Sequence, residues 1–277
     1  MDAAEDMTSP TEGVTTSVDA SSGGEGAPLD VQGHRGDRGN VPPGNTLPSF
    51  ESAIALGVDT LEGDLQITAD GVVVFGHDAD LAVTGCTWAG VAEPPSTMIA
   101  ALSSAEVQMF DCHLELEGIQ PPPLLAEVLD LDAEIAFNLE MKRLAVADAD
   151  VYMQALVDYD QACGRCLGGR LIIQSFNWQL IEHANATFGD RIDFRGSVLT
   201  LSSAGSAALE EAAAYAEILS PTHEVVDATL VARAHAAGLQ VIPWTVNEVD
   251  DMQRLIELGV DGIITDYPDH LLTHLGR

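Results

Sequence analysis

The chain has 277 residues and a formal net charge of −33, with 11 basic residues against 44 acidic ones. This length allows one large α/β domain or two small ones and is sufficient to bury a substantial core. Binding to nucleic acid needs a basic stripe, and the sequence has none, so the charge argues against nucleic acid as a partner; it disfavours anionic membrane surfaces for the same reason.

The first 28 residues are acidic and rich in Ser, Thr and Gly, which predicts a disordered tether. They lack the basic and apolar regions of a signal peptide, although such a tether often follows a removed export signal or a lipid anchor. The sequence contains no apolar run of eighteen residues, so we expect no membrane span. We therefore expect a tether over residues 1–28 and one folded domain over residues 29–277.

From residue 29 onward, short apolar runs alternate with amphipathic segments. The runs expected to form strands are residues 29–36, 59–68, 133–142, 170–176, 193–200, 216–221, 239–246 and 260–266. The segments expected to form helices are residues 45–57, 148–162, 177–189, 203–216, 225–238 and 247–259, and several end in Gly, as helix C-caps do. Repeated strand–helix units imply parallel strands, and eight of them predict a (β/α)₈ TIM barrel. A doubly wound sheet is the alternative, but no GxGxxG loop follows the first strand.

One segment interrupts this alternation. In "LEGDLQITADGVVVFGHD", residues 61–78, two β-prone runs are joined through Asp-Gly, which is a hairpin signal. We therefore expect residues 72–78 to return antiparallel to the second barrel strand and not to form a barrel strand. The Gly- and Pro-rich residues from about 79 to 123 are then a small insertion after the second barrel strand, on the active face of the barrel.

The four cysteines bear on the compartment in which the protein works. Cys86 and Cys112 both lie in the insertion, where a disulfide between them would pin its base, and Cys163 and Cys166 have CxxC spacing. The even count permits two disulfides and an exported protein. Together with the tether, this favours an extracytoplasmic location, periplasmic or secreted, with anchoring through the tether as one option. Reduced cysteines and a cytoplasmic location are the alternative.

Polar residues gather at the predicted ends of the first strands. In a barrel of this type the functional site lies at the C-terminal ends of the strands, and side chains two residues apart face the same side. The residues in question are His34, Arg35, Glu62, Asp64, His77, Glu140 and Lys142. Lys142 is the only lysine of the chain, which favours a specific role over a general contribution to solubility.

Three of these residues, Glu62, Asp64 and Glu140, are carboxylates that would repel one another unless a cation lay between them. Ligation by oxygen alone selects a hard divalent ion such as Ca²⁺ or Mg²⁺. The alternative is that the first two line a solvated strand edge and that Glu140 forms an ordinary ion pair with Lys142. That alternative requires several coincidences, because all of these residues fall at strand ends.

A divalent ion beside Arg35 and Lys142 would make a pocket for an anion with at least two free oxygens. His34 and His77 would add an acid and a base. Such a set fits cleavage of a phosphodiester, in which the positive groups neutralise the charge that builds on phosphorus. One histidine takes a proton from the nucleophile, and the other protonates the leaving alcohol.

These residues closely resemble the glycerophosphodiester phosphodiesterase family. The matching segments are "HRG" at 34–36, "GNTLPSFESAIALGVDTLEGDLQITADGVVVFGHDADL" at 44–81, "NLEMK" at 138–142, "QSF" at 174–176, "PWTVN" at 243–247 and "GVDGIITDYP" at 259–268. The resemblance covers essentially everything after the tether. It implies a (β/α)₈ barrel with a small insertion after the second strand. It also implies hydrolysis of glycerophosphodiesters, such as glycerophosphocholine, to glycerol 3-phosphate and an alcohol.

The resemblance also implies a role for each site residue, by motif match. The implied catalytic pair is His34 and His77. The implied metal ligands are Glu62, Asp64 and Glu140, for Ca²⁺ or Mg²⁺. The implied substrate-binding residues are Arg35 and Lys142, which would contact phosphate, and Phe176 and Trp244, which would line the pocket or simply be core aromatics.

The sequence departs from the family at one position beside the site. The family usually carries Pro-Glu-Asn-Thr where this chain has Pro-Gly-Asn-Thr at residues 43–46. The missing carboxylate is not expected to be a metal ligand, so the metal triad is retained. It would orient Arg35 or the first histidine, and Asp37 in the same loop is a candidate substitute for it. The substitution Gly44→Glu is expected to leave the fold intact.

Two other functions compete with this hypothesis. A phospholipase D-type enzyme acting on lysolipids or sphingolipids would want an exposed apolar collar, and the insertion has only a modest one, formed by Trp88, Val91, Met98 and Ile99. A catalytically lapsed barrel that binds phosphodiesters has Gly44 as its only support. The expected partner is therefore a small-molecule glycerophosphodiester, and the sequence does not indicate an oligomeric state.

Overall fold

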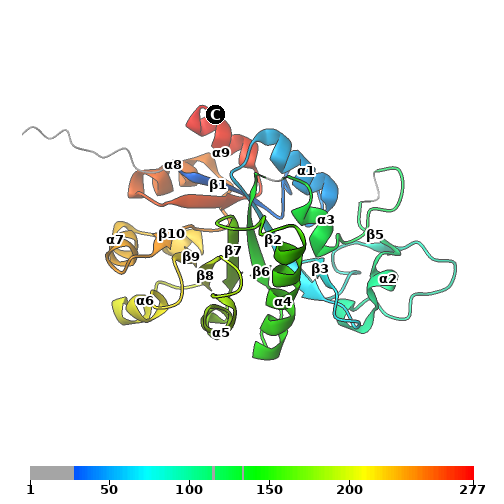
Figure 1. Cartoon of the computed structure of the whole chain (residues 1–277). Coiled ribbons are helices and arrows are strands. Elements are labelled where there is room, and N and C mark those ends of the chain that lie inside the picture. Colours follow the sequence, from blue (N-terminus) through cyan, green and yellow to red (C-terminus); the bar gives the residue numbers. More distant parts are fainter. Residues whose placement is uncertain (1–27, 114–115, 133) are drawn as a thin grey trace, which may run out of the picture.

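A computed structural model of the chain describes residues 28–113, 116–132 and 134–277, so nearly all of the tether predicted over residues 1–28 lies outside the described residues. Within these ranges, eight parallel strands form a nearly closed barrel (Figure 1). In chain order they are β1 (Asp30–His34), β2 (Thr60–Ile67), β6 (Ala136–Met141), β7 (Leu171–Ser175), β8 (Arg195–Thr200), β9 (Ile218–Pro221), β10 (Gln240–Val241) and β11 (Gly262–Thr265). Their spatial order is β10-β9-β8-β7-β6-β2-β1-β11, and the predicted TIM barrel is confirmed.

Backbone hydrogen bonds close the barrel between its two end strands. Asp261 N donates to Val241 O over 2.9 Å, and Val246 N donates to Ile264 O over 3.0 Å. The strand expected over residues 239–246 is nevertheless only the two residues of β10, so its predicted length was wrong. Pro243 has no N–H to donate, and the regular ladder therefore stops before it, although the chain continues alongside β11.

Helices cover the outside of the barrel (Figure 1). The longer ones are α1 (Leu47–Leu56), α4 (Val146–Ala162), α5 (Trp178–Phe188), α6 (Ser206–Ala212), α7 (Ala228–Ala236), α8 (Val249–Leu258) and α9 (Pro268–Leu275). The sequence pattern had not indicated α9, and it had extended α6 at both ends. The C-caps of α1 and α8 are Gly57 and Gly259, with φ of 89° and 80°, which side chains rarely adopt. No helix in the described ranges combines the length with the apolar character that crossing a bilayer requires.

Both faces of the barrel strands are covered, so even the polar residues of β2 are buried. Every residue of β2 and of β7 is buried, with helices on one side and the barrel interior on the other. Apolar side chains on the outer face pack under the helices, and four isoleucines form a separate cluster in the barrel: Ile172, Ile218, Ile242 and Ile264. The polar residues at the C-terminal ends of the strands lie further along the barrel axis than this isoleucine cluster.

The segment between β2 and β6 begins with a hairpin. β3 (Val73–Phe75) pairs antiparallel with β2, with Leu65 opposite Phe75, as the Asp-Gly signal predicted. The segment then contains β4 (Thr87–Trp88), η1 (Ile99–Ala101), α2 (Ser104–Val107), β5 (Phe110–Asp111) and α3 (Leu125–Leu129). Part of it projects from one side of the barrel (Figure 1). It has a small apolar core of its own, which includes the Cys86–Cys112 disulfide.

The two disulfides of the structure should differ in what they contribute to stability. Cys86–Cys112 closes 26 residues and Cys163–Cys166 closes 3. In the chain-entropy account the longer loop contributes about 3.5 kcal/mol and the shorter about 1.6 kcal/mol. The paired substitution of Cys86 and Cys112 by Ala should therefore lower the free energy of unfolding more than the same substitution of Cys163 and Cys166. Denaturant titration of both variants checks this order, and an equal or inverted effect would contradict it.

Candidate active site

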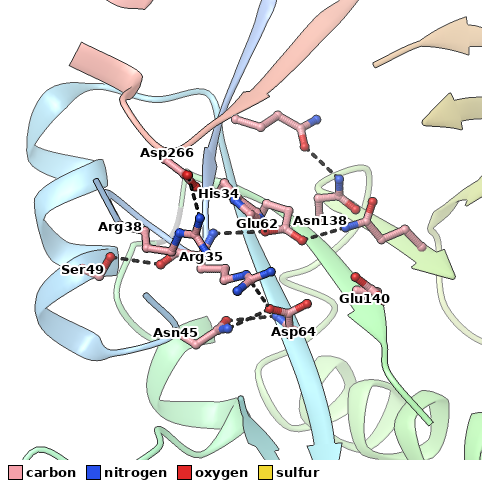
Figure 2. Close-up of polar contacts among 12 residues, drawn as sticks. His34, Arg35, Arg38, Asn45, Ser49, Glu62, Asp64, Asn138, Glu140 and Asp266 are labelled. Carbon is pink, nitrogen blue, oxygen red and sulfur yellow. Dashed lines mark hydrogen bonds and ion pairs between the residues drawn. The ribbon is translucent and has the colours of Figure 1, made fainter. Parts of the chain in front are cut away.

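The register of the strands brings the predicted site residues together. His34 is the last residue of β1 and lies opposite Glu62 of β2. On the other side of β2, Asp64 lies opposite Glu140 of β6. Glu140 in turn lies opposite Gln174 of β7. The side chains consequently meet over one end of the barrel (Figure 2).

Glu62, Asp64 and Glu140 form a compact cluster of acids. Each offers a carboxylate oxygen that lies within 4.8 Å of the others, and all three residues are buried. Two cations border the cluster. Lys142 Nζ lies 3.0 Å from Glu140 Oε1, and Arg35 Nε lies 2.9 Å from Asp64 Oδ2. Three buried oxygen donors on rigid strands fit a hard divalent cation.

The protonation of this cluster reflects its burial and its crowding. Burial and the charge of Asp64 raise the pKa of Glu62 well above its ordinary value. The same two causes raise the pKa of Glu140 to about 7. Burial acts in the same direction on Asp64, but Arg35 and Lys142 outweigh it and lower the pKa of Asp64 to about 2. Without a cation among them, the acids therefore tend to retain protons at Glu62 and Glu140.

His34 is held by a partner that the sequence patterns did not reveal. Its Nδ1 lies 2.5 Å from Asp266 Oδ1, and its Nε2 lies 3.9 Å from Glu62 Oε2 (Figure 2). If Nδ1 donates to Asp266, the free Nε2 faces the acidic cluster, ready to exchange a proton. Burial lowers the pKa of His34, whereas the hydrogen bond to Asp266 raises it.

Asp266 is itself fixed by two further donors. Arg38 Nη2 donates to its Oδ2 over 2.6 Å, and Asn247 Nδ2 donates to the same oxygen over 2.9 Å. Burial alone would raise the pKa of Asp266, but hydrogen bonds from His34 and Arg38 hold it well below its ordinary range. Asp266 is therefore an ionised anchor for the imidazole ring.

The turn after β1 places Arg35 in a left-handed conformation, with φ of 56°. Three contacts stabilise it: Asn45 N and Ser49 Oγ both donate to the Arg35 carbonyl, and Arg35 N donates to Glu62 Oε2. Asn45 also holds Asp64, because its Nδ2 donates to the carboxylate and its Oδ1 accepts from Asp64 N. The same loop thus positions the guanidinium and one of the acids.

All predicted site residues except Asp64 line a single cavity of about 170 Å³. The residues it brings together are His34, Arg35, Glu62, His77, Glu140, Lys142, Phe176 and Trp244. Phe176 and Trp244 pack edge to face with their ring centroids 5.5 Å apart. Both line the cavity, and Phe176 is exposed, so they are not aromatics of the deep core. Such a cavity, with cations, acids and two histidines on its walls, can bind an anion and move protons to and from it.

Five residues that contact the site were not predicted as site residues from the sequence. They are Arg38, Asn45, Gln174, Asn247 and Asp266. Gln174 Nε2 donates to Glu62 Oε1 over 2.7 Å and so fixes the orientation of that acid. All but Arg38 fall within segments already matched to the family. Their position in those matched segments, next to strand ends, is the signal that could have identified them from the sequence.

The contacts in the loop around Gly44 differ from those expected from the sequence. The Asp37 carboxylate does not orient Arg35 or His34, because its oxygens accept from Ser52 and Asn40 instead. A Cβ at Gly44 would lie 2.6 Å from the Arg35 Cβ and 2.9 Å from the Arg38 side chain. A side chain at Gly44 therefore has to displace one of these arginines, whereas the expectation that Gly44→Glu leaves the fold intact stays a prediction.

The crowding at Gly44 predicts that even Gly44→Ala lowers kcat/KM for glycerophosphocholine. The methyl group must displace Arg35 from its place beside Asp64, and a loss of about tenfold or more is expected from such a shift. Gly205→Ala is the matched control, because nothing lies within 4 Å of a Cβ at that position. Steady-state kinetics of both variants provide the measurement. An unchanged kcat/KM in Gly44→Ala would show that the loop has room.

Comparison with known proteins agrees with this geometry. Residues 34–270 match the glycerophosphoryl diester phosphodiesterase family. A glycerophosphodiester phosphodiesterase of Caldanaerobacter subterraneus subsp. tengcongensis is 30% identical over 254 residues, which cover 87% of this chain and 96% of that protein. A solved structure from Silicibacter pomeroyi matches with a TM-score of 0.77 and 29% identity, covering 89% of this chain and 92% of that one.

A second solved structure contains a small molecule. An Oleispira antarctica phosphodiesterase, in complex with the product sn-glycerol-3-phosphate, matches with a TM-score of 0.75 and 23% identity. The match covers 90% of this chain and 97% of that one. The family match extends over nearly the whole described barrel and includes the acidic cluster and both histidines. The chain is therefore a member of the glycerophosphoryl diester phosphodiesterase family.

Proposed function

We propose that His34 and His77 act as base and acid in the hydrolysis of glycerophosphodiesters, with a divalent cation on Glu62, Asp64 and Glu140. The activity itself follows from family membership: the enzyme converts a glycerophosphodiester and water to glycerol 3-phosphate and an alcohol. One observation carries the mechanism. The two histidines border the same small cavity as Glu62 and Glu140, with Asp64 directly beside them.

The substrate phosphate would lie between the cations of this cavity. Arg35 can donate a forked pair of hydrogen bonds to two phosphate oxygens, and Lys142 adds a compact charge. The Oleispira protein was solved with glycerol 3-phosphate, the anion that is also the product expected here. Phe176 and Trp244 would cover the carbon skeleton of the glycerol.

The carboxylate cluster would hold Ca²⁺ or Mg²⁺, the hard ions that all-oxygen ligands favour. When bound, such an ion supplies stabilisation of the negative charge that develops on the phosphate oxygens. Gln174 and Asn45 hold two of the ligands in place, as outer-shell partners of metal ligands usually do. One histidine takes the proton of the nucleophile and the other gives a proton to the departing oxygen.

We also propose that the protein works in an oxidising compartment outside the cytoplasm. The Cys86–Cys112 and Cys163–Cys166 disulfides support this location, because such bonds persist mainly in exported proteins. Thiol alkylation of the protein taken directly from its source cells tests the proposal. Four freely alkylated cysteines would argue for a cytoplasmic protein.

The release of glycerol 3-phosphate from glycerophosphocholine, with Ca²⁺ or Mg²⁺ and with a chelator, tests the function. His34→Ala and His77→Ala should each lower turnover at least about a hundredfold, which is the contribution expected of a general acid or base. His183→Ala is the control, since His183 lies on α5 and pairs with Asp150. Undiminished turnover in both test variants would remove the acid–base assignment. Faster hydrolysis of lysophosphatidylcholine would instead favour a phospholipase D-type activity.

A further inference from the structure

Helix α9 carries two histidines that lie outside the active site, His270 and His274. They are four residues apart, and residues at this spacing lie one turn apart on the same side of a helix. Both side chains line one shallow groove of about 280 Å³, together with Thr273 of α9 and Val249 of α8. Figure 1 shows these two helices side by side on the outside of the barrel. The groove therefore brings two imidazole rings together, away from the acidic cluster.

Imidazole nitrogen suits Zn²⁺, Cu²⁺ and Ni²⁺, whereas hard ions such as Ca²⁺ and Mg²⁺ prefer oxygen ligands. Two histidines four residues apart on one face of a helix are a known arrangement for binding zinc. We propose that His270 and His274 form a second metal site, which takes one of these transition-metal ions and leaves its other positions to water. The proposal goes beyond the proposed function and does not rest on it, because the two sites share no residue.

The ring of His274 is oriented by residues of α8. Its Nε2 lies 2.6 Å from Gln253 Oε1, and Gln253 Nε2 donates to Glu257 Oε1 over 2.5 Å. Because an amide oxygen only accepts, Nε2 of His274 carries the proton and Nδ1 keeps the lone pair that a metal needs. Histidines that bind metals usually donate their other ring N–H to an oxygen in this way. The contacts from Glu257 through Gln253 thus prepare His274 as a metal ligand.

His270 is oriented by an aromatic neighbour. Its ring stacks on Tyr267, with the ring centroids 5.1 Å apart and an angle of 13° between the planes. Its Nε2 lies 4.0 Å from Asp269 Oδ2, which is too long for a hydrogen bond but places a negative charge beside the ring. Since neighbours already orient both histidine rings, metal binding costs less side-chain entropy than it would for two free side chains.

The surroundings of the groove favour a cation. His270 and His274 are both exposed, so ions in solution reach them. Among the described residues, the walls of the groove include no Lys or Arg that would repel a positive ion. The formal net charge of −33 also raises the concentration of cations near the surface. This field acts on all divalent ions alike, so the imidazole ligands decide which of them binds here.

Calorimetric titration with Ni²⁺ tests the site, after saturation with Ca²⁺ to occupy the carboxylate cluster. His270→Ala and His274→Ala should each weaken Ni²⁺ binding at least about tenfold, since even the loss of a residue that only contacts a metal ligand costs that much. His235→Ala is the matched control, because His235 is the one histidine of α7 and pairs with Asp261. Glu140→Gln should bind Ni²⁺ at this site as the wild type does, which separates it from the carboxylate cluster.

Thermal unfolding of the same Ca²⁺-saturated proteins gives a second measurement. A metal held by two residues of α9 binds only while that helix is folded, so Ni²⁺ at about a hundred times its Kd should raise the Tm by about 5 °C or more. The rise should persist in His235→Ala and disappear in His270→Ala and His274→Ala. The Tm without Ni²⁺ shows that each variant folds, because these side chains are exposed.

Three results would overturn the second metal site. They are wild-type Ni²⁺ affinity in either His270→Ala or His274→Ala, no Ni²⁺ binding to the Ca²⁺-saturated wild type, and an equal loss of affinity in His235→Ala. The last of these would mean that scattered surface histidines bind the ion. Hydrolysis of glycerophosphocholine is measured separately and without Ni²⁺, so failure of this site leaves the proposed function standing, and failure of hydrolysis leaves this test unaffected.

Discussion

Glu140→Gln is expected to reduce glycerophosphodiester turnover by about a thousandfold or more, and to abolish tight binding of the divalent cation. The substitution removes one of three carboxylates that lie within 4.8 Å of one another while keeping the size of the side chain. Charge stabilisation by a bound ion contributes several kcal/mol to the transition state, and each 1.4 kcal/mol is about a factor of ten. Lys142, which lies 3.0 Å from Glu140, would also lose an ionic partner.

Isothermal titration with Ca²⁺ and with Mg²⁺ measures the binding directly, and release of glycerol 3-phosphate measures turnover. Glu51→Gln is the control, because Glu51 is an exposed acid on α1. The affinity for the ion should also weaken as the pH falls below about 7, since the pKa of Glu140 is raised to about 7 and its proton must leave before the ion binds. Wild-type affinity in Glu140→Gln would exclude this residue from the metal site.

Asp266→Asn is expected to lower kcat about a hundredfold or more while leaving KM nearly unchanged. The carboxylate accepts from His34 Nδ1 and thereby selects the ring tautomer whose Nε2 faces the acidic cluster. An amide in its place can present an N–H to the ring, and it leaves Arg38 without its ionic partner. Loss of the orienting carboxylate in a comparable His–Asp pair costs several orders of magnitude in kcat.

A pH profile distinguishes this positioning role from a merely structural one. The hydrogen bond to Asp266 raises the pKa of His34, so its loss should move the acidic limb of kcat/KM to lower pH. Asp266→Glu should recover part of the lost kcat, and Asp250→Asn, at an exposed position in α8, should leave both kcat and the profile unchanged. A lower kcat with an unshifted acidic limb would contradict the assignment of Asp266 to His34.

Local sequence patterns predicted the structure correctly wherever a single strand or a single turn determines it. The two-residue spacing of Glu62 and Asp64, and of Glu140 and Lys142, places each pair on one face of a strand whatever the rest of the fold does. The Asp-Gly turn after β2 likewise determined the antiparallel return of β3. The same reasoning failed at residues 239–246, where an apolar run predicted a long strand and Pro243 interrupted its ladder.

The most informative contacts of the site are not local. Asp266 follows β11 and His34 ends β1, 232 residues apart, and they meet only because β11 pairs with β1 as the barrel closes. The residues next to His34 and Asp266 in the sequence give no indication that these two side chains meet. The tight space at Gly44, by contrast, arises within one loop, from the side chains of Arg35 and Arg38.

The amino-acid sequence by itself determined the kind of fold, the family and the nine residues expected in the site, because hydrophobic periodicity, strand spacing and motif composition are properties of short segments. Only the tertiary structure decided which of those residues touch and which partners orient them. The physical reason is that strand register and barrel closure result from packing summed over the whole chain, so the distances between side chains on different strands are not encoded in any one segment.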